Sequence, residues 1–295
     1  MIFSPYDNAS CGDESIGFLV FAISLFPIIL PSATIQPFNV GYSQIALNAG
    51  GKNMIGPCFL TLEAEGKIRL SELKVTGYEE SMEYLMEMGF SVTFQRRASN
   101  GMPYATYEWA DSSEDMETWV GGSWYNQDTS AIITSENDVL FNPGDGLWFD
   151  TPELKDCSGF NLVSSGQVIS GSQGFELNAG GKIGVCNMMP AAVNLSTIEI
   201  QGYEDSMEYL MEMGFSVTMQ SLLSNGMPSV TYEWSDASED METWVGGAWY
   251  NQDTTELITK ENDVVIAPGQ GFWADAPELK DCTAFHFVVP AVIGE

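Results

Sequence analysis

The feature that most constrains the fold of this chain is an internal duplication. Residues 77–157 align without a gap with residues 202–282, and 60 of these 81 positions are identical. The hexapeptide LNAGGK also occurs twice, at 47–52 and 177–182. A repeat of this length predicts two similar structural units in tandem, which we place at residues 34–164 and 165–295. Because copies this similar have had little time to diverge, identity between them is no evidence of function.

The periodicity inside each unit is that of β-strands. In FSVTFQ (90–95) and SVTYEW (229–234), apolar and polar residues alternate, which gives a strand one buried and one hydrated face. The Asn-Gly of SNGMP separates the equivalent segments within a unit and predicts a hairpin. We expect further strands at 73–76, 139–141, 147–149 and 160–163. The prediction is a mainly β fold, made of two tandem β-sandwich or barrel-like repeats.

One segment of each unit has helical spacing. In GYEESMEYLMEMG, residues Met82, Leu85 and Met86 would share one helix face, and Gly89 could end the helix. We therefore expect one short helix in each unit. The run MEYLMEM also alternates between apolar and polar residues, so a strand remains the alternative.

An apolar leader precedes the first unit. The run from Ile16 to Ala33 has no charged residue and resembles the hydrophobic core of an export signal. Pro27 and Pro31 disfavour a transmembrane helix. The preceding segment contains acidic residues and no Lys or Arg, whereas export signals begin with basic residues. We interpret residues 1–33 as a signal-like leader and expect a secreted or cell-surface protein. The alternative is a buried apolar N-terminal strand or helix.

The charge balance excludes several partners. Formal net charge is −31, from 41 acidic and 10 basic residues, so nucleic acid and anionic membrane surfaces would be repelled. A solvated acidic exterior, cation binding or a basic partner fits this charge. The chain's one histidine, His286, is matched by Asn161 in the first copy. This argues against shared histidine catalysis or a histidine metal site. Since no nucleophile or phosphate-binding motif occurs either, we expect a protein that is not an enzyme.

The cysteines suggest a disulfide framework. Each unit has one cysteine near its start and one near its end, Cys58 with Cys157 and Cys186 with Cys282, while Cys11 lies in the leader. In an exported protein this arrangement predicts one disulfide per unit. Four buried free thiols are the alternative.

Each unit also carries a tryptophan-rich segment, DMETWVGGSWYNQDT (115–129) in the first and DMETWVGGAWYNQDT (240–254) in the second. Trp109 and Trp234 follow a strand pattern and are expected in the core, and Trp148 and Trp273 are also expected to pack. The rings beside VGG could instead form an exposed platform that stacks on a sugar. The candidate sugar-binding residues are Trp119, Trp124, Tyr125, Asn126, Asp128, Trp244, Trp249, Tyr250, Asn251 and Asp253. The alternative, which we favour, is that these rings close the end of a β-sandwich.

Acidic residues precede the same segments and could hold Ca²⁺, the one cofactor considered. They are Asp111, Glu114, Asp115, Glu117, Asp236, Glu239, Asp240 and Glu242. Because their spacing differs from that of an EF-hand loop, a solvated acidic loop is the favoured alternative.

Three motifs resemble tandem β-repeats of exported bacterial surface proteins. They are LNAGGKNMIG near the start of the first unit, NGMPYATYEW at its middle and PGDGLWF near its end. The resemblance spans most of residues 45–163 and 175–289, although GGKIGVC in the second unit is two residues shorter after the lysine. It implies an extracellular β-module and assigns no catalytic residue.

These observations predict an exported, non-enzymatic surface, adhesion or structural repeat protein. The first alternative is a carbohydrate-binding protein with one aromatic platform per repeat, and the second is a calcium-stabilised repeat. The expected partner is accordingly a glycan or another surface protein.

Overall fold

The computed structural model divides the chain into two compact units, Met1–Pro37 and Phe38–Glu295. The residues that it describes all lie in the second unit. They are 40–62, 64, 66–82, 93–97, 103–110, 122–169, 171–206, 215–220, 228–235 and 247–291. The predicted leader lies outside them, and the predicted boundary between residues 164 and 165 stays a prediction.

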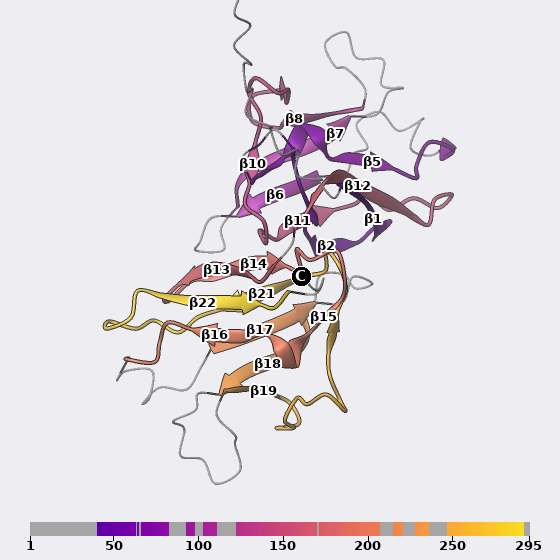
Figure 1. Ribbon diagram of the computed structural model, residues 1–295. Coiled ribbons are helices and arrows are strands. Elements are labelled where there is room, and N and C mark those ends of the chain that lie inside the picture. The colour runs from indigo at the N-terminus through magenta and orange to yellow at the C-terminus, as the bar shows by residue number, and fades with distance from the viewer. Residues whose placement is uncertain are drawn as a thin grey trace, which may run out of the picture. The chain divides into compact units, whose positions relative to one another are not determined.

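The strands of the first sequence copy form three antiparallel sheets (Figure 1). One sheet contains β1 (Val40–Asn48), β12 (Gly159–Val168), β3 (Phe59–Leu60) and β5 (Lys74–Thr76). A second has the order β2 (Lys52–Ile55), β11 (Leu147–Asp150), β6 (Thr93–Arg97), β7 (Pro103–Ala110), β8 (Ser123–Asn126) and β9 (Ala131–Ile132). The third pairs β4 (Ile68–Arg69) with β10 (Leu140–Phe141), and the 3₁₀ helix η1 (Leu70–Glu72) follows β4.

The strands of the second copy pair in a matching order. β13 (Gln173–Asn178), β22 (Ala284–Val289) and β16 (Glu199–Gln201) form one sheet. The order of the next is β14 (Lys182–Cys186), β21 (Gly271–Asp275), β17 (Phe215–Gln220), β18 (Pro228–Ser235) and β19 (Ala248–Asn251). β15 (Val193–Asn194) pairs with β20 (Val265–Ile266), and η2 is Leu195–Thr197. The predicted mainly β fold is therefore confirmed.

Two hydrophobic cores lie between these sheets. In the first copy, Leu47 and Leu162 from the β1–β12 sheet share a core with Trp109, Trp124 and Phe149 from the β2–β11–β6 sheet. The equivalent strands of the second copy enclose their own core. Side chains on successive strand positions point to opposite faces, so the alternation read from the sequence turns one face of each sheet inward.

The expected secondary structure agrees with the structure wherever the residues are described. β5, β10, β11 and β12 fall on the four segments expected to be strands. β6 pairs with β7, and β17 with β18, as the predicted hairpin requires. The hairpin turn and the expected helix around Leu85 and Met86 lie outside the described residues. Within the described segments, no helix has the length and apolar character needed to cross a bilayer.

Main-chain hydrogen bonds connect the sheets of the two copies near β2 and β14, and we call this region the join (Figure 1). Gly56 N–H donates to Gly269 O, and Cys186 N–H donates to Gly144 O, both at 2.9 Å. Glycine permits this approach of the two backbones: a Cβ added to Gly146 would lie 2.6 Å from the carbonyl carbon of Gly184. The two sets of sheets are thus connected through their backbones as well as by side-chain packing.

The predicted disulfides are wrong, because the four described cysteines are free. Cys58 and Cys186 are buried near the join, where Cys58 Sγ lies 3.7 Å from Asn187 O and Cys186 Sγ lies 3.5 Å from Asp145 O. Cys157 instead contacts Gly77 O and Gly159 O, and Cys282 makes the equivalent contacts with Gly202 and Ala284. Even the equivalence of Cys58 and Cys186 is lost in the structure. Lys182 of β14 and Lys52 of β2 occupy matching places in the strand register. Four residues further along each strand, Cys186 therefore corresponds to Gly56, not to Cys58.

Candidate functional site

The aromatic residues proposed as a sugar platform are core residues where they are described. Trp124 and Trp249 are each 1% exposed, and Tyr125 and Tyr250 are buried as well. Trp124 Nε1–H donates to Leu73 O at 2.8 Å, and its ring meets Trp109 edge to face at a centroid distance of 5.3 Å. Trp249 makes the same contacts with Ile198 O and Trp234. The hypothesis that these four rings form an exposed platform is therefore wrong. Trp119 and Trp244 lie outside the described residues.

The polar residues of the proposed platform build a turn. Asn126 Oδ1 accepts the backbone N–H groups of Asp128 and Thr129, at 2.9 and 3.1 Å. Asn251 does the same for Asp253 and Thr254. Ser130, at the end of the first turn, has a φ of 54°, a conformation that non-glycine residues adopt rarely. The two asparagines thus have a structural role, and Asp128 and Asp253 are exposed beside them.

The expected core positions are confirmed for Trp109 and Trp234, which are 4% and 5% exposed. Each donates its indole N–H to a tyrosine hydroxyl at 2.7 Å, Tyr78 in one case and Tyr203 in the other. Trp148 and Trp273 are half-buried and lie against each other, with ring centroids 6.0 Å apart. This contact between the two copies explains why those rings pack although they follow a turn.

All eight candidate calcium ligands lie outside the described residues. Elsewhere in the chain, among the described side chains, no cluster of three or more His, Cys, Asp or Glu residues could hold a metal ion. The calcium hypothesis stays a prediction.

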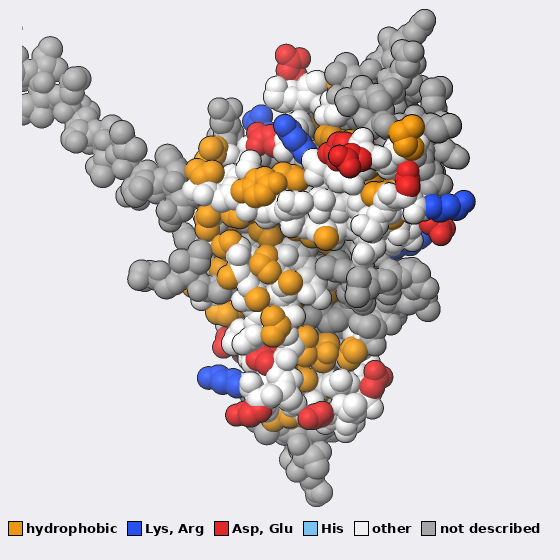
Figure 2. Space-filling model, turned by 90° about the vertical axis from the view of Figure 1, so that its right-hand side faces the viewer, with side chains coloured by type: hydrophobic (Ala, Val, Ile, Leu, Met, Phe, Trp, Pro, Cys, Tyr) orange, Lys and Arg blue, Asp and Glu red, His pale blue; other side chains and the backbone are white. Residues whose placement is uncertain are grey.

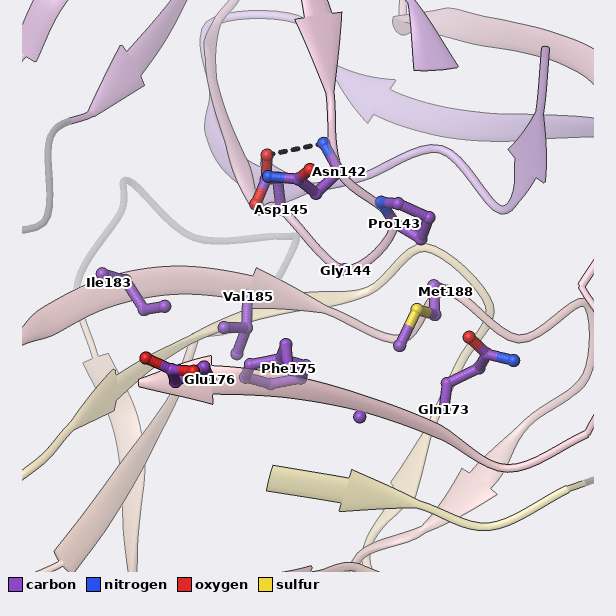
Figure 3. A pocket seen from close by; sticks show the side chains of 11 residues that line it. Asn142, Pro143, Gly144, Asp145, Gln173, Phe175, Glu176, Ile183, Val185 and Met188 are labelled. Atoms are coloured by element: carbon purple, nitrogen blue, oxygen red, sulfur yellow. Dashed lines mark hydrogen bonds between the residues drawn. The ribbon is translucent and has the colours of Figure 1, made fainter. Parts of the chain in front are cut away.

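The site that sequence reasoning missed is a pocket of about 440 Å³ at the join (Figure 3). One wall is the loop that carries Asn142, Pro143, Gly144 and Asp145 from the first copy. The opposite wall belongs to the second copy and consists of Gln173, Gly174, Phe175, Glu176, Ile183, Val185 and Met188. Because both copies contribute a wall, neither copy alone would contain this pocket.

Local hydrogen bonds hold the first wall in place. Asp145 Oδ2 accepts the backbone N–H of Asn142 at 2.9 Å, which closes the Asn-Pro-Gly-Asp turn (Figure 3). Lys67 Nζ donates to Asn142 Oδ1 at 2.7 Å. Gly144 O accepts the N–H of Cys186. The turn is thus fixed at its base and also anchored to β14.

At the equivalent place in the first copy, the loop lies closer to the strand. The loop with Gly269 corresponds to the loop with Gly144, and Ile45 corresponds to Phe175. A Cβ added to Gly269 would lie 2.3 Å from Ile45 Cδ1, whereas one added to Gly144 would lie 3.4 Å from Phe175 Cδ1. The Phe175 ring is stacked on Phe287 instead, with centroids 4.7 Å apart. The pocket therefore exists because the loop lies further from β13 than its counterpart does from β1.

The pocket has a mixed and acidic lining. Its described charged side chains are Asp145 and Glu176, and Phe175, Val185 and Met188 supply apolar surface. Glu176 is exposed on β13. Beside the pocket, burial raises the pKa of the Cys186 thiol well above its usual value, and Cys58 and Asp145 raise it further. Both effects disfavour the thiolate, so this cysteine is a poor nucleophile.

The sequence contained an indirect sign of this site. The segments NPGDG and APGQG have the Pro and Gly composition of turns, and their glycines also allow contact with the other copy. Which glycines face another backbone depends on the docking of the two sets of sheets, which no local pattern specifies.

Comparison with known proteins finds no protein-family model that matches this chain and no curated protein similar to it in sequence.

Proposed function

We propose that this chain is an exported, non-enzymatic surface protein that acts in adhesion, with its partner bound at the pocket between the two copies. The observation that carries this proposal is the composite pocket, since one wall comes from each copy. A pocket of this volume lies within the range of roughly 300–1,000 Å³ that is usual for binding sites.

The surface composition supports the proposal. The chain has 41 acidic and 10 basic residues, a ratio of about four to one. On the face drawn in Figure 2, hydrophobic side chains are gathered between groups of acidic residues toward either end. Five large apolar residues of the described segments are each more than half exposed: Val40, Tyr42, Leu62, Met82 and Val265. A surface that combines charge with exposed apolar side chains suits recognition of another protein.

The first test is the location of the chain. We expect the full chain, expressed in a bacterial host with a C-terminal tag, to be cleaved by protease added to intact cells. A chain without residues 1–33 is expected to remain protected. Equal protection of both chains, with a periplasmic marker intact, would contradict export.

The second test is adhesion. Beads coated with the full chain are expected to be retained on a layer of cells under flow, more than beads coated with heat-unfolded chain. Equal retention of the two bead types would contradict a role in adhesion, whatever the location of the protein.

A further inference from the structure

The pocket lies along a sheet edge. Gln173, Gly174, Phe175 and Glu176 are consecutive in β13, and all four line it. Among the described strands, β13 pairs with β22 alone and is the edge strand of its sheet. In an antiparallel edge strand, alternate N–H and C=O groups point away from the neighbouring strand. Such an edge can pair with an extended peptide from another protein.

The charge of the pocket selects the kind of peptide. Glu176 lies on the edge strand, and Asp145 lies on the loop across from it (Figure 3). The described lining residues include no Lys, Arg or His, and Lys67 Nζ is hydrogen-bonded to the lining residue Asn142. Two acidic residues that line one pocket favour a cationic guest, and the large negative charge of the chain would speed its approach.

The apolar lining fits the stem of a long basic side chain. Phe287 covers one side of the Phe175 ring, and the ring also lines the pocket together with Met188 and Val185. Lys and Arg bury their methylene stems on apolar surface while the charged end stays near water or a carboxylate. An aromatic ring adds attraction for a cation that lies over its face.

We propose that the pocket binds an extended basic segment of a partner protein. The segment pairs along the outer edge of β13 and directs a Lys or Arg side chain between Glu176 and Asp145. This inference rests on the proposed adhesion function, since it names the partner chemistry of the same pocket.

The test uses the full chain and a fluorescein-labelled hexapeptide of alternating Lys and Thr, with binding measured by fluorescence anisotropy at pH 8 and low salt. We expect Glu176→Gln to weaken binding about tenfold, the order of effect found for close charge pairs at interfaces. The matched control is Glu136→Gln, because Glu136 is exposed and outside the pocket lining. This control is expected to change affinity less than about twofold, as exposed charges contribute little.

Two further probes test the pairing itself. Methylation of alternate peptide nitrogens removes the N–H groups needed for strand pairing, and we expect it to abolish binding. Replacement of every Lys by Glu is expected to do the same. The proposal is overturned if the peptide does not bind, if the two Gln variants weaken binding equally, or if the methylated peptide or a free linear triamine binds as tightly as the parent peptide.

Failure here and failure of the proposed function can be told apart. If Glu176→Gln leaves bead retention unchanged while heat-unfolded chain is not retained, adhesion stands and the pocket is not its site. Thermal melts of both Gln variants verify that they fold, which is expected because both side chains are exposed.

Discussion

Replacement of Asn53 by Leu should stabilise the protein. Asn53 lies in β2, is 1% exposed, and finds no partner for Oδ1 or Nδ2 among the described residues. A buried polar group without a hydrogen bond costs about 1–3 kcal/mol. Leu has the same branched outline as Asn, so it removes this cost with little change of shape. The second copy carries an apolar residue at this place, since strand register aligns Asn53 with Ile183.

The expected gain in the free energy of unfolding is about 1–3 kcal/mol, less any strain from the new methyl groups. For a protein of this size, each kcal/mol raises Tm by roughly 2–4 °C. The measurement is urea unfolding followed by tryptophan fluorescence, with the slope m compared between variants to verify that the unfolded state is unchanged.

The matched control is Thr151→Val, an exchange of a polar for an apolar residue close to the same strand. Thr151 is also buried, but its Oγ1 accepts the N–H of Gly51 at 3.0 Å and lies within hydrogen-bond distance of Asn48 O and Gly51 O, one of which accepts its single proton. Loss of these bonds should lower stability by about 0.5–1.5 kcal/mol. The two variants should therefore change stability in opposite directions. If Asn53→Leu destabilises the protein as Thr151→Val does, the Asn53 amide has partners and the reasoning is refuted.

Three further outcomes follow from the same contacts. Gly56→Ala should lower the free energy of unfolding by about 1–3 kcal/mol, because the new Cβ would lie 2.2 Å from Cys186 Sγ. Gly174→Ala is the control, because its new Cβ would come no closer than 3.5 Å to another atom, Phe287 O. It should lower the free energy of unfolding by less than about 1 kcal/mol in the same urea titration. Trp124→Phe should lower the free energy of unfolding by about 1–3 kcal/mol, since it removes the hydrogen bond to Leu73 O and part of the core packing. A sugar titration of the folded variant should show the same affinity as the wild type. Burial raises the pKa of Cys58 from 9.0 to about 12, so the folded protein holds this proton more tightly than the unfolded chain does. The stabilisation that the protonated Cys58 thiol provides is therefore complete below pH 9 and is lost as the pH rises toward 12. In urea titrations from pH 8 to pH 11, the difference in unfolding free energy between wild type and Cys58→Ala should narrow or reverse. A difference that stays constant would show that the thiol titrates normally.

Local pattern was sufficient to predict the strands. The alternation in SVTYEW marks a strand with one buried face, and β18 with buried Tyr232 and Trp234 matches it. The Asn-Gly pair predicted the neighbours of the hairpin, because turn geometry links residues close in sequence. Trp109 and Trp234 were assigned to the core for the same local reason.

The errors concern contacts between residues far apart in the sequence. An exposed Trp124 ring, the less favoured of the two hypotheses drawn from the sequence, is wrong, because Leu73 O accepts the indole N–H of this buried side chain. Matching positions in the two copies suggested disulfides within each copy, yet Cys58 and Cys186 lie near the join and Cys157 lies beside Gly77. Sequence position gives no distance between side chains that separate strands carry.

The sequence by itself determined a duplicated, acidic, mainly β protein, because repetition, charge and period-two alternation can be read along the chain. Tertiary structure decided which rings are buried, which thiols are neighbours, and that a pocket lies between Gly144 and β13. The physical reason is close packing across the join. A Cβ added to Gly269 would lie 2.3 Å from Ile45 Cδ1, whereas one added to Gly144 would lie 3.4 Å from Cδ1 of Phe175, whose ring stacks on Phe287.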